Sequence, residues 1–197
     1  MKALLPLVAS LCVLTAVPLQ AQAESSSHFT TGPFVSLAIG GSSIAPGAIV
    51  RAETGDTDHS NGLGKLSVGY WFAEHWGVSA SYMDMGEFTQ TYTDGSFKGE
   101  VRSASIDLLG RVALSERWAL VGKMMLVHNK TKRISATGNT AGFDKLHGDS
   151  TRLVLPGLEI NYRVNDAASV YFEMESRGKG ADKLDLGYAG VGLRWQF

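Results

Sequence analysis

Cysteine is almost absent from the 197-residue chain, and the single one, Cys12, lies near the N-terminus. The first residues have the layout of a signal peptide: a lysine at the second position, an apolar stretch over residues 3–17, and Ala-Gln-Ala at residues 21–23 as a cleavage site. We therefore predict a cleaved signal peptide over residues 1–23 and a single domain over residues 24–197. That domain has no cysteine, which excludes disulfides and thiol chemistry.

Charge and long apolar runs are also scarce. Charged residues make up 19% of the chain, and 18 basic and 19 acidic residues give a formal net charge of -1. This balance gives no indication of a nucleic-acid partner. No segment after the N-terminus has about 18 consecutive apolar residues, so we predict no transmembrane helix. The 23 glycines and the 44% hydrophobic content are instead typical of a glycine-rich all-β protein.

Eight segments alternate apolar and polar residues with a period of two, which is the pattern of β-strands. They cover residues 33–41, 63–72, 76–86, 101–113, 118–128, 152–163, 168–176 and 184–197. Each is close to the length of about 9–11 residues that a tilted strand needs to cross a bilayer.

The connections between these segments alternate between long and short. Long polar connections cover residues 42–62, 87–100 and 129–151, and a shorter but equally polar one covers residues 177–183. Short turns cover residues 73–75, 114–117 and 164–167. Barrels of the outer membrane combine short turns at one end with long loops at the other. We therefore predict an all-β fold, an eight-stranded antiparallel up-and-down transmembrane β-barrel, with both termini at the short-turn end.

Charged residues keep to one face of the predicted strands. The more apolar face is charged only at its loop ends, at Asp84, Arg102, Arg152 and Asp185. The opposite face carries Lys65, Asp107, Arg111, Lys123, Glu159, Arg163, Glu173, Glu175 and Arg194, five basic and four acidic residues. A Lys or Arg that faces lipid at the midplane costs about 2–4 kcal/mol, whereas paired charges inside a narrow lumen neutralise one another. The pattern predicts an uncharged lipid-facing belt around a charge-paired lumen.

A soluble eight-stranded barrel of the lipocalin kind is the main alternative, because it has the same period with an apolar interior. The positions of the tryptophans argue against it. Trp71, Trp76, Trp118 and Trp195 all lie at strand ends next to short turns or the C-terminus. Clustering at one end is typical of an aromatic girdle at a membrane interface.

Two segments resemble a known family. Residues 64–86 resemble the hairpin of the second and third strands of OmpA-like outer-membrane barrels, and residues 190–197, Gly-Val-Gly-Leu-Arg-Trp-Gln-Phe, resemble their closing strand. Small stand-alone barrels of the OmpX and OmpW type are equally compatible. The resemblance implies a place in the bacterial outer membrane, with its lipids and lipopolysaccharide as partners. It also implies that the outer-membrane assembly machinery reads the C-terminal strand ending at Phe197.

Candidate catalytic groups are few. Asp58-His59-Ser60-Asn61-Gly62 joins a histidine to a serine, but neighbours on an extended chain point to opposite faces, so we interpret the segment as a turn. His28, His75, His128 and His147 lack the paired spacing of metal ligands. Glu173 and Glu175 share a strand face and either share protons in catalysis or pair with Arg111, Lys123 or Arg194. We favour ion pairs and predict no catalytic, cofactor or metal site.

Three functions follow from these patterns. The first is a non-enzymatic outer-membrane protein with a lumen filled by side chains and with loops 42–62, 87–100 and 129–151 for surface contacts. The second is a narrow pore or conduit for small or hydrophobic solutes, with Lys123 and Arg111 in its path. The third is a lipid A-modifying enzyme that uses His59 or the two glutamates.

Pro156 lies within a predicted strand, although proline removes a hydrogen-bond donor from the sheet. We therefore predict a bulge there, or a position near the loop end of the strand.

Overall fold

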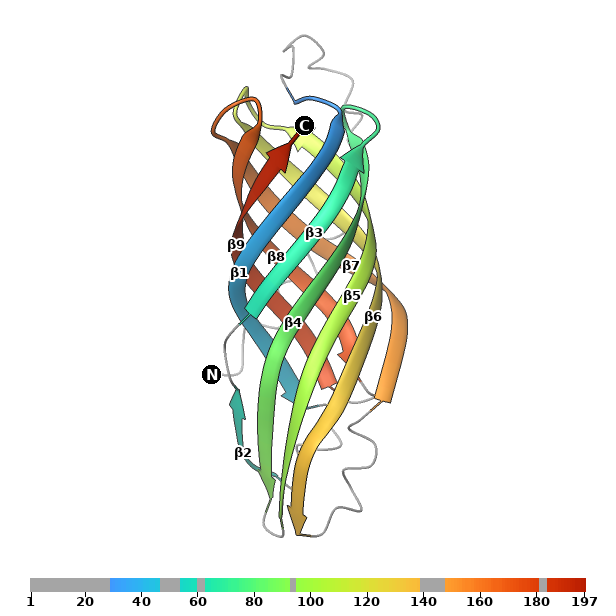
Figure 1. Ribbon diagram of the computed structural model, residues 1–197, viewed down its shortest axis with the longest axis vertical. Coiled ribbons are helices and arrows are strands. Elements are labelled where there is room, and N and C mark those ends of the chain that lie inside the picture. The colour runs from blue at the N-terminus through green and yellow to red at the C-terminus, as the bar shows by residue number, and fades with distance from the viewer. Residues whose placement is uncertain (1–28, 47–53, 60–62, 93–94, 139–147, 181–183) are drawn as a thin grey trace.

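The computed structural model describes residues 29–46, 54–59, 63–92, 95–138, 148–180 and 184–197, which fold into antiparallel strands (Figure 1). The strands are β1 (Gly32–Pro46), β2 (Thr54–His59), β3 (Leu63–Trp71), β4 (Trp76–Tyr92), β5 (Gly95–Ala113), β6 (Trp118–Gly138), β7 (Gly148–Arg163), β8 (Ala168–Gly180) and β9 (Leu184–Gln196). Within these ranges no helix has the length and apolarity needed to cross a membrane. The signal peptide predicted for residues 1–23 lies outside the described residues and stays a prediction.

The barrel closes between its first and last strands. β1 pairs with β3 on one side and with β9 on the other, and every other barrel strand pairs with its chain neighbours. β1 and β3 to β9 thus form the eight-stranded antiparallel barrel that the sequence predicts. The C-terminus lies at the end with the short turns, where the Phe197 N–H donates to the Pro33 carbonyl oxygen at 3.0 Å. We call the two ends of the barrel the short-turn end and the loop end.

The strands run further toward the loop end than the apolar pattern predicts. β5 has 19 residues and β6 has 21, so the segments 87–100 and 129–151 are largely paired strand rather than loop. The segment 42–62 also contains β2, which pairs with the loop-end part of β4 where β3 has already ended. These loop predictions are wrong because hydrogen-bonded pairing continues into water, where no apolar face marks it.

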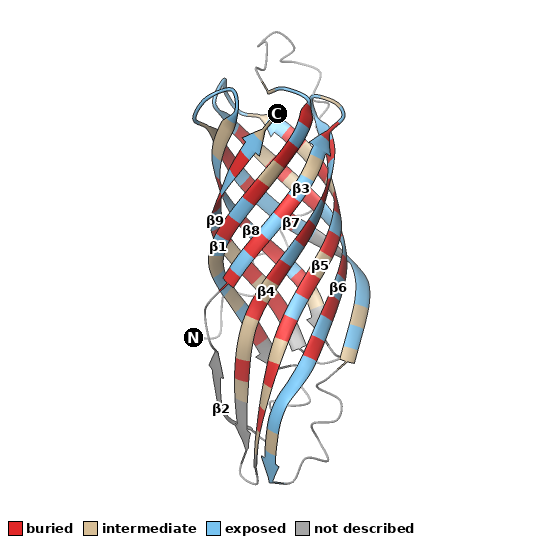
Figure 2. Cartoon of the chain, viewed as in Figure 1, coloured by how far each residue is buried: buried red, intermediate tan, exposed pale blue. Residues whose placement is uncertain are grey.

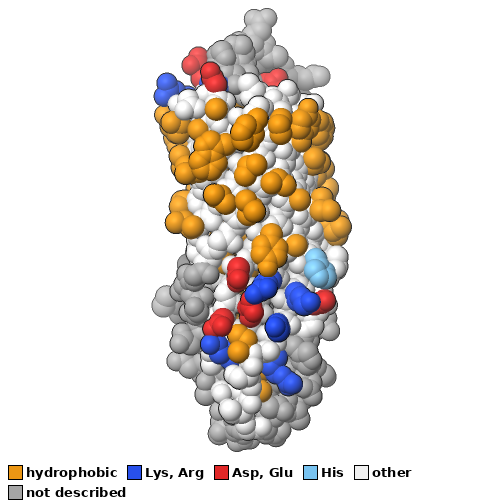
Figure 3. Space-filling view, in the orientation of Figure 1, with side chains coloured by type: hydrophobic (Ala, Val, Ile, Leu, Met, Phe, Trp, Pro, Cys, Tyr) orange, Lys and Arg blue, Asp and Glu red, His pale blue; other side chains and the backbone are white. Residues whose placement is uncertain are grey.

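The outer face carries the predicted apolar belt. Buried and exposed residues alternate along the strands (Figure 2), and hydrophobic side chains form a band toward the short-turn end (Figure 3). On β6 the belt extends from Trp118 to His128, a length of about 25 Å for a strand tilted by about 40°. That height matches the apolar band of outer-membrane barrels.

The aromatic girdle includes three of the four tryptophans. Trp76, Trp118 and Trp195 are 40–51% exposed near the short-turn end, as predicted. The placement of Trp71 in the girdle is wrong, because this residue is 1% exposed and faces the lumen. Its neighbour Phe72 takes the outward position, as strict alternation along the strand requires.

Pro156 lies at an irregularity of the barrel wall, as predicted. The register of β6 and β7 shifts between Lys123 and Met125, opposite the proline. β7 pairs with β8 only from Gly157 to Arg163. On the loop-end side of Gly157, the described part of β7 pairs with β6 alone. Figure 1 shows this part of β7 separated from β8.

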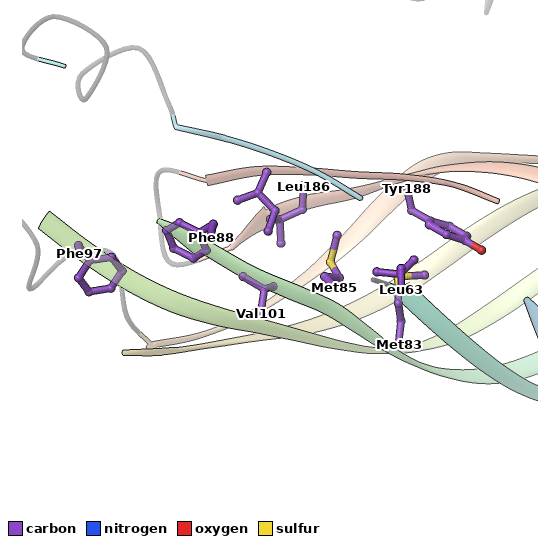
Figure 4. Packing of buried hydrophobic residues seen from close by; sticks show 9 residues of the cluster. Leu63, Met83, Met85, Phe88, Phe97, Val101, Leu186 and Tyr188 are labelled. Carbon is purple, nitrogen blue, oxygen red and sulfur yellow. The ribbon is translucent and has the colours of Figure 1, made fainter. Parts of the chain in front are cut away.

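The interior has three tiers. Toward the loop end, an apolar plug is built from Ile44, Leu63, Met83, Met85, Phe88, Phe97, Val101, Leu186 and Tyr188 (Figure 4). Charged side chains fill the middle of the lumen. Toward the short-turn end, Phe34, Trp71, Leu109 and Val121 pack together.

Candidate functional site

A group of seven charged side chains occupies the middle of the lumen, and we call it the lumen ion cluster. Its members are Lys65, Lys123, Glu159, Glu173, Glu175, Arg177 and Arg194. They come from β3, β6, β7, β8 and β9, because inward positions of all these strands meet at one height. Each side chain is at most 7% exposed.

Two lysines connect the three carboxylates of the cluster. Lys65 Nζ lies 2.8 Å from Glu173 Oε2 and 2.5 Å from Glu175 Oε1. Lys123 Nζ lies 3.0 Å from Glu159 Oε2 and 3.1 Å from Glu175 Oε1, and it also contacts Glu173. Each carboxylate therefore meets at least one ammonium group directly, which offsets the cost of its burial.

Two arginines complete the cluster at its two ends. Arg194 forms a bidentate pair with Glu159, with N–O distances of 2.7 and 2.9 Å. Arg177 pairs with Glu175 and donates to the hydroxyl oxygens of Ser105 at 3.0 Å and Ser81 at 3.4 Å. Such forked, charge-assisted bonds fix both partners in position.

These contacts decide between the two interpretations of Glu173 and Glu175. The ion pairs with Lys123 are confirmed, whereas Arg194 pairs with Glu159 instead and Arg111 contacts neither glutamate. Arg177, predicted as part of a loop, is fully buried and belongs to the cluster. It lies two residues after Glu175, so extending the alternation by one step would have placed it in the lumen. The cluster therefore holds four cations and three carboxylates.

The other predicted lumen charges lie outside the cluster. Asp107 is buried and accepts a hydrogen bond from Ser79 Oγ at 2.9 Å. Arg111 is buried near the short-turn end, and Arg163 is half-buried there. All nine predicted positions thus face the interior, which confirms the predicted face of each strand.

The outer wall beyond the belt carries a mixed set of charges (Figure 3). Arg102 Nε lies 2.5 Å from Glu100 Oε1 and 4.0 Å from Asp84 Oδ2, and the hydrogen bond to Glu100 raises the pKa of Arg102. Lys130 and Lys132 project outward from β6 in the same zone. Neither of these two lysines forms an ion pair with another residue that the structure describes.

The histidines that the structure describes do not converge on a site. His59 belongs to β2, opposite Phe88, and its predicted neighbour Ser60 lies outside the described residues, as do His28 and His147. His75 Nδ1 donates to the Arg111 carbonyl oxygen at 3.1 Å, and His128 Nδ1 lies 2.8 Å from Thr151 Oγ1. No group of three or more metal-ligating side chains occurs in the described part of the chain.

Comparisons with known proteins agree with this architecture. Residues 9–197 match the model of a family described as the outer membrane protein beta-barrel domain. No curated protein matches the chain. Among solved structures, Ail of Yersinia pestis, in complex with the heparin analogue sucrose octasulfate, is 17% identical with a TM-score of 0.53, covering 85% of this chain and 99% of that one. Neisserial surface protein A is 13% identical with a TM-score of 0.53, covering 84% and 97%.

Proposed function

The chain belongs to the outer membrane protein beta-barrel domain family, and we propose that it is a non-enzymatic member whose lumen is filled by its own side chains and whose loop end makes contacts at the cell surface. Its place is the bacterial outer membrane, where barrels of this kind direct their short turns to the periplasm. The observation that carries the proposal is the lumen ion cluster, with the apolar plug beyond it.

An eight-stranded barrel has an interior only wide enough for side chains. Here the cluster crosses the lumen from Lys65 on β3 to Glu159 on β7, and each of its groups is held by a charged partner. Toward the loop end, Phe88 of β4 and Phe97 of the adjacent β5 pack against each other within the apolar plug, with ring centroids 5.8 Å apart. A hydrated ion on the lumen axis would have to separate both layers, so we expect the barrel not to conduct.

Planar-bilayer recording of the purified barrel tests this expectation. We expect no large, stable conductance from the native protein or from Arg117→Gln, a control that removes an exposed charge in a short turn. A stable conductance that changes when Lys123 or Arg111 is replaced by Gln would refute the filled lumen. It would establish the narrow pore instead.

For the surface contacts, we propose lipopolysaccharide as a partner of the outer wall. Lys130 and Lys132 project just beyond the end of the belt, at the height where the phosphates of an outer-leaflet glycolipid lie. In its solved structure, Ail of Yersinia pestis also binds a polyanion, the heparin analogue sucrose octasulfate. Ammonium groups at this height attract phosphate without entering the hydrocarbon layer.

Thermal unfolding in vesicles with and without lipopolysaccharide tests this contact. We expect lipopolysaccharide to raise the Tm of the native barrel, and the rise to shrink in the double variant Lys130→Gln/Lys132→Gln. Arg117→Gln, at the opposite end of the barrel, is the matched control and should keep the full rise. An equal rise in all three proteins would refute the role of these lysines.

The assembly machinery is the second proposed partner. The Phe197 side chain is 78% exposed on the outer face at the end of the closing strand, where another protein can reach it. Replacing Phe197 by Ser should lower the amount of barrel in the outer membrane while leaving refolding of the purified chain in detergent unchanged. Loss of both would indicate a role in stability rather than in recognition.

A further inference from the structure

The short-turn end of the lumen contains a cavity lined by three arginines from three strands. They are Arg111 of β5, Arg163 of β7 and Arg194 of β9, and the side chain of Phe29 forms part of the wall. The cavity volume is about 20 Å³. A water molecule requires about 10–15 Å³ on this measure, so the space fits one small group and not an extended ligand.

Arg111 brings a positive charge to this cavity and has no carboxylate of the described residues in ion-pair contact with it. Its Nε and Nη2 donate to the Glu74 carbonyl oxygen at 2.9 and 2.6 Å, and Nη2 also donates to the Thr30 carbonyl oxygen at 3.3 Å. Its guanidinium lies 4.2 Å from the centroid of the Trp71 ring and 4.9 Å from that of Phe29. All of these partners are uncharged, and Arg111 forms no ion pair with any residue of the described ranges, although it is only 5% exposed. Burial of a charge without an opposite charge is costly, so an anion beside Arg111 would stabilise the structure.

Arg194 contributes an unused donor. Its two terminal nitrogens are bound to Glu159, but its buried Nε–H has no hydrogen-bond partner among the residues that the structure describes. Arg163 adds a further guanidinium, with Nη1 at 3.8 Å from Asp166 Oδ1. The Asp166 side chain is 97% exposed, and water competes strongly for such a pair. Three guanidinium groups and one carboxylate, that of Asp166, thus line the cavity, and the buried Nε–H of Arg194 is an unsatisfied donor among the described residues.

We propose that this cavity binds a single small anionic group, a phosphate or a carboxylate, that enters from the short-turn side. Planar guanidinium groups are the donors that match the oxygens of phosphate and carboxylate. The Phe29 ring, whose centroid lies 5.5 Å from Arg163 and 4.9 Å from Arg111, shields two of the three guanidinium groups from water. The site is separated from the proposed surface contacts by the lumen ion cluster and does not depend on them.

Arginine side-chain NMR tests the proposal on the full mature barrel in phosphatidylcholine nanodiscs. The Nε–Hε signals are followed while inorganic phosphate is added at constant ionic strength. We expect a saturable shift of the Arg194 signal. Arg163→Gln, at a half-buried position that the fold tolerates, should raise the apparent Kd for phosphate by about tenfold, the effect of losing one charge-assisted hydrogen bond.

Arg117→Gln is the matched control, since it removes an exposed arginine of a neighbouring short turn that binds Tyr162 Oη at 3.3 Å outside the cavity. It should leave the Kd for phosphate unchanged. Absence of a saturable shift in the native barrel would overturn the proposal. So would an equal rise of the Kd in both variants, which indicates general attraction to a basic surface.

A second titration distinguishes the sources of the group. Glycerol 3-phosphate carries the same phosphate on a larger molecule. If it produces the same shift of the Arg194 signal, the cavity accepts the terminal group of a larger periplasmic molecule. If only inorganic phosphate does, the cavity is a site for the free ion, and the proposal holds in that narrower form.

Discussion

Removal of one buried carboxylate should destabilise the barrel more than removal of any exposed one, and Glu159→Gln is the sharpest case. Glu159 accepts a hydrogen bond from Arg194 on each of its oxygens, at 2.7 and 2.9 Å, and Lys123 Nζ also lies 3.0 Å from Oε2. Its side chain is completely buried. The glutamine keeps the shape of the side chain, so the change isolates the charge.

The expected magnitude follows from the composition of the lumen ion cluster. Four cations there face three carboxylates, and the glutamine leaves four cations with two. Removing one partner of a buried ion pair typically costs about 3–5 kcal/mol, because the remaining charge stays buried without compensation. Glu159 serves two cations, so we expect the loss of unfolding free energy to lie in the upper part of this range.

Equilibrium urea unfolding in phosphatidylcholine vesicles, followed by tryptophan fluorescence in phosphate-free buffer, measures this loss. The control is Glu87→Gln, which breaks a pair with Lys98 at 2.6 Å in which both side chains are at least 40% exposed. Exposed pairs of this kind contribute about 0.2–1 kcal/mol. A loss for Glu159→Gln that is no larger than the loss for Glu87→Gln would refute the reasoning. It would show that water reaches the lumen.

Three further predictions concern stability in the same assay. Arg177→Met should lower the free energy of unfolding by about 1–3 kcal/mol, less than Glu159→Gln, because it leaves the cluster with three charges of each sign. A larger loss would show that Arg177 acts mainly through its hydrogen bonds. Gly192→Ala should cost about 1–3 kcal/mol, since its Cβ would lie 2.4 Å from the Tyr171 ring and 2.7 Å from the Leu37 carbonyl oxygen. Gly64→Ala is the control, because its Cβ would meet open space, and it should be nearly neutral. Met124→Arg, in the middle of the belt, should cost about 2–4 kcal/mol, and Ser135→Arg, in the extension beyond it, less than about 1 kcal/mol; equal costs would place the lipid boundary elsewhere.

The direction of each side chain could be predicted from the sequence because the strand period is two and a lipid belt excludes charge. Lys123 shows how strong this signal is, since it lies in an otherwise apolar strand and still faces the lumen. Trp71 shows the opposite error. Its aromatic character suggested the membrane interface, but alternation with Phe72 fixes it inside, so the period is a better guide than residue type.

Strand ends and ion partners could not be predicted in the same way. The period of two fixes the face of a residue but not its height along the barrel axis, which depends on the stagger between strands. Arg111, Lys123 and Arg194 were therefore left as alternative partners of Glu173 and Glu175, and of these Lys123 pairs with them while Arg194 pairs with Glu159. Arg177 was missed because the Gly-Lys-Gly that follows it is typical of a turn, yet β8 continues through these residues with a bulge at Arg177 and a positive φ at Gly178.

The missed arginine changes the electrostatics of the whole interior. The sequence predicted five basic and four acidic residues in the lumen, and Arg177 raises the excess of cations from one to two, while Arg111 forms no ion pair with a carboxylate of the described residues. Arg194 connects the two regions, because it pairs with Glu159 in the cluster and also lines the short-turn cavity. An anion in that cavity would meet a guanidinium whose opposite edge is already neutralised by Glu159. The lumen ion cluster and the cavity therefore form one electrostatic unit, in which cations outnumber carboxylates by two.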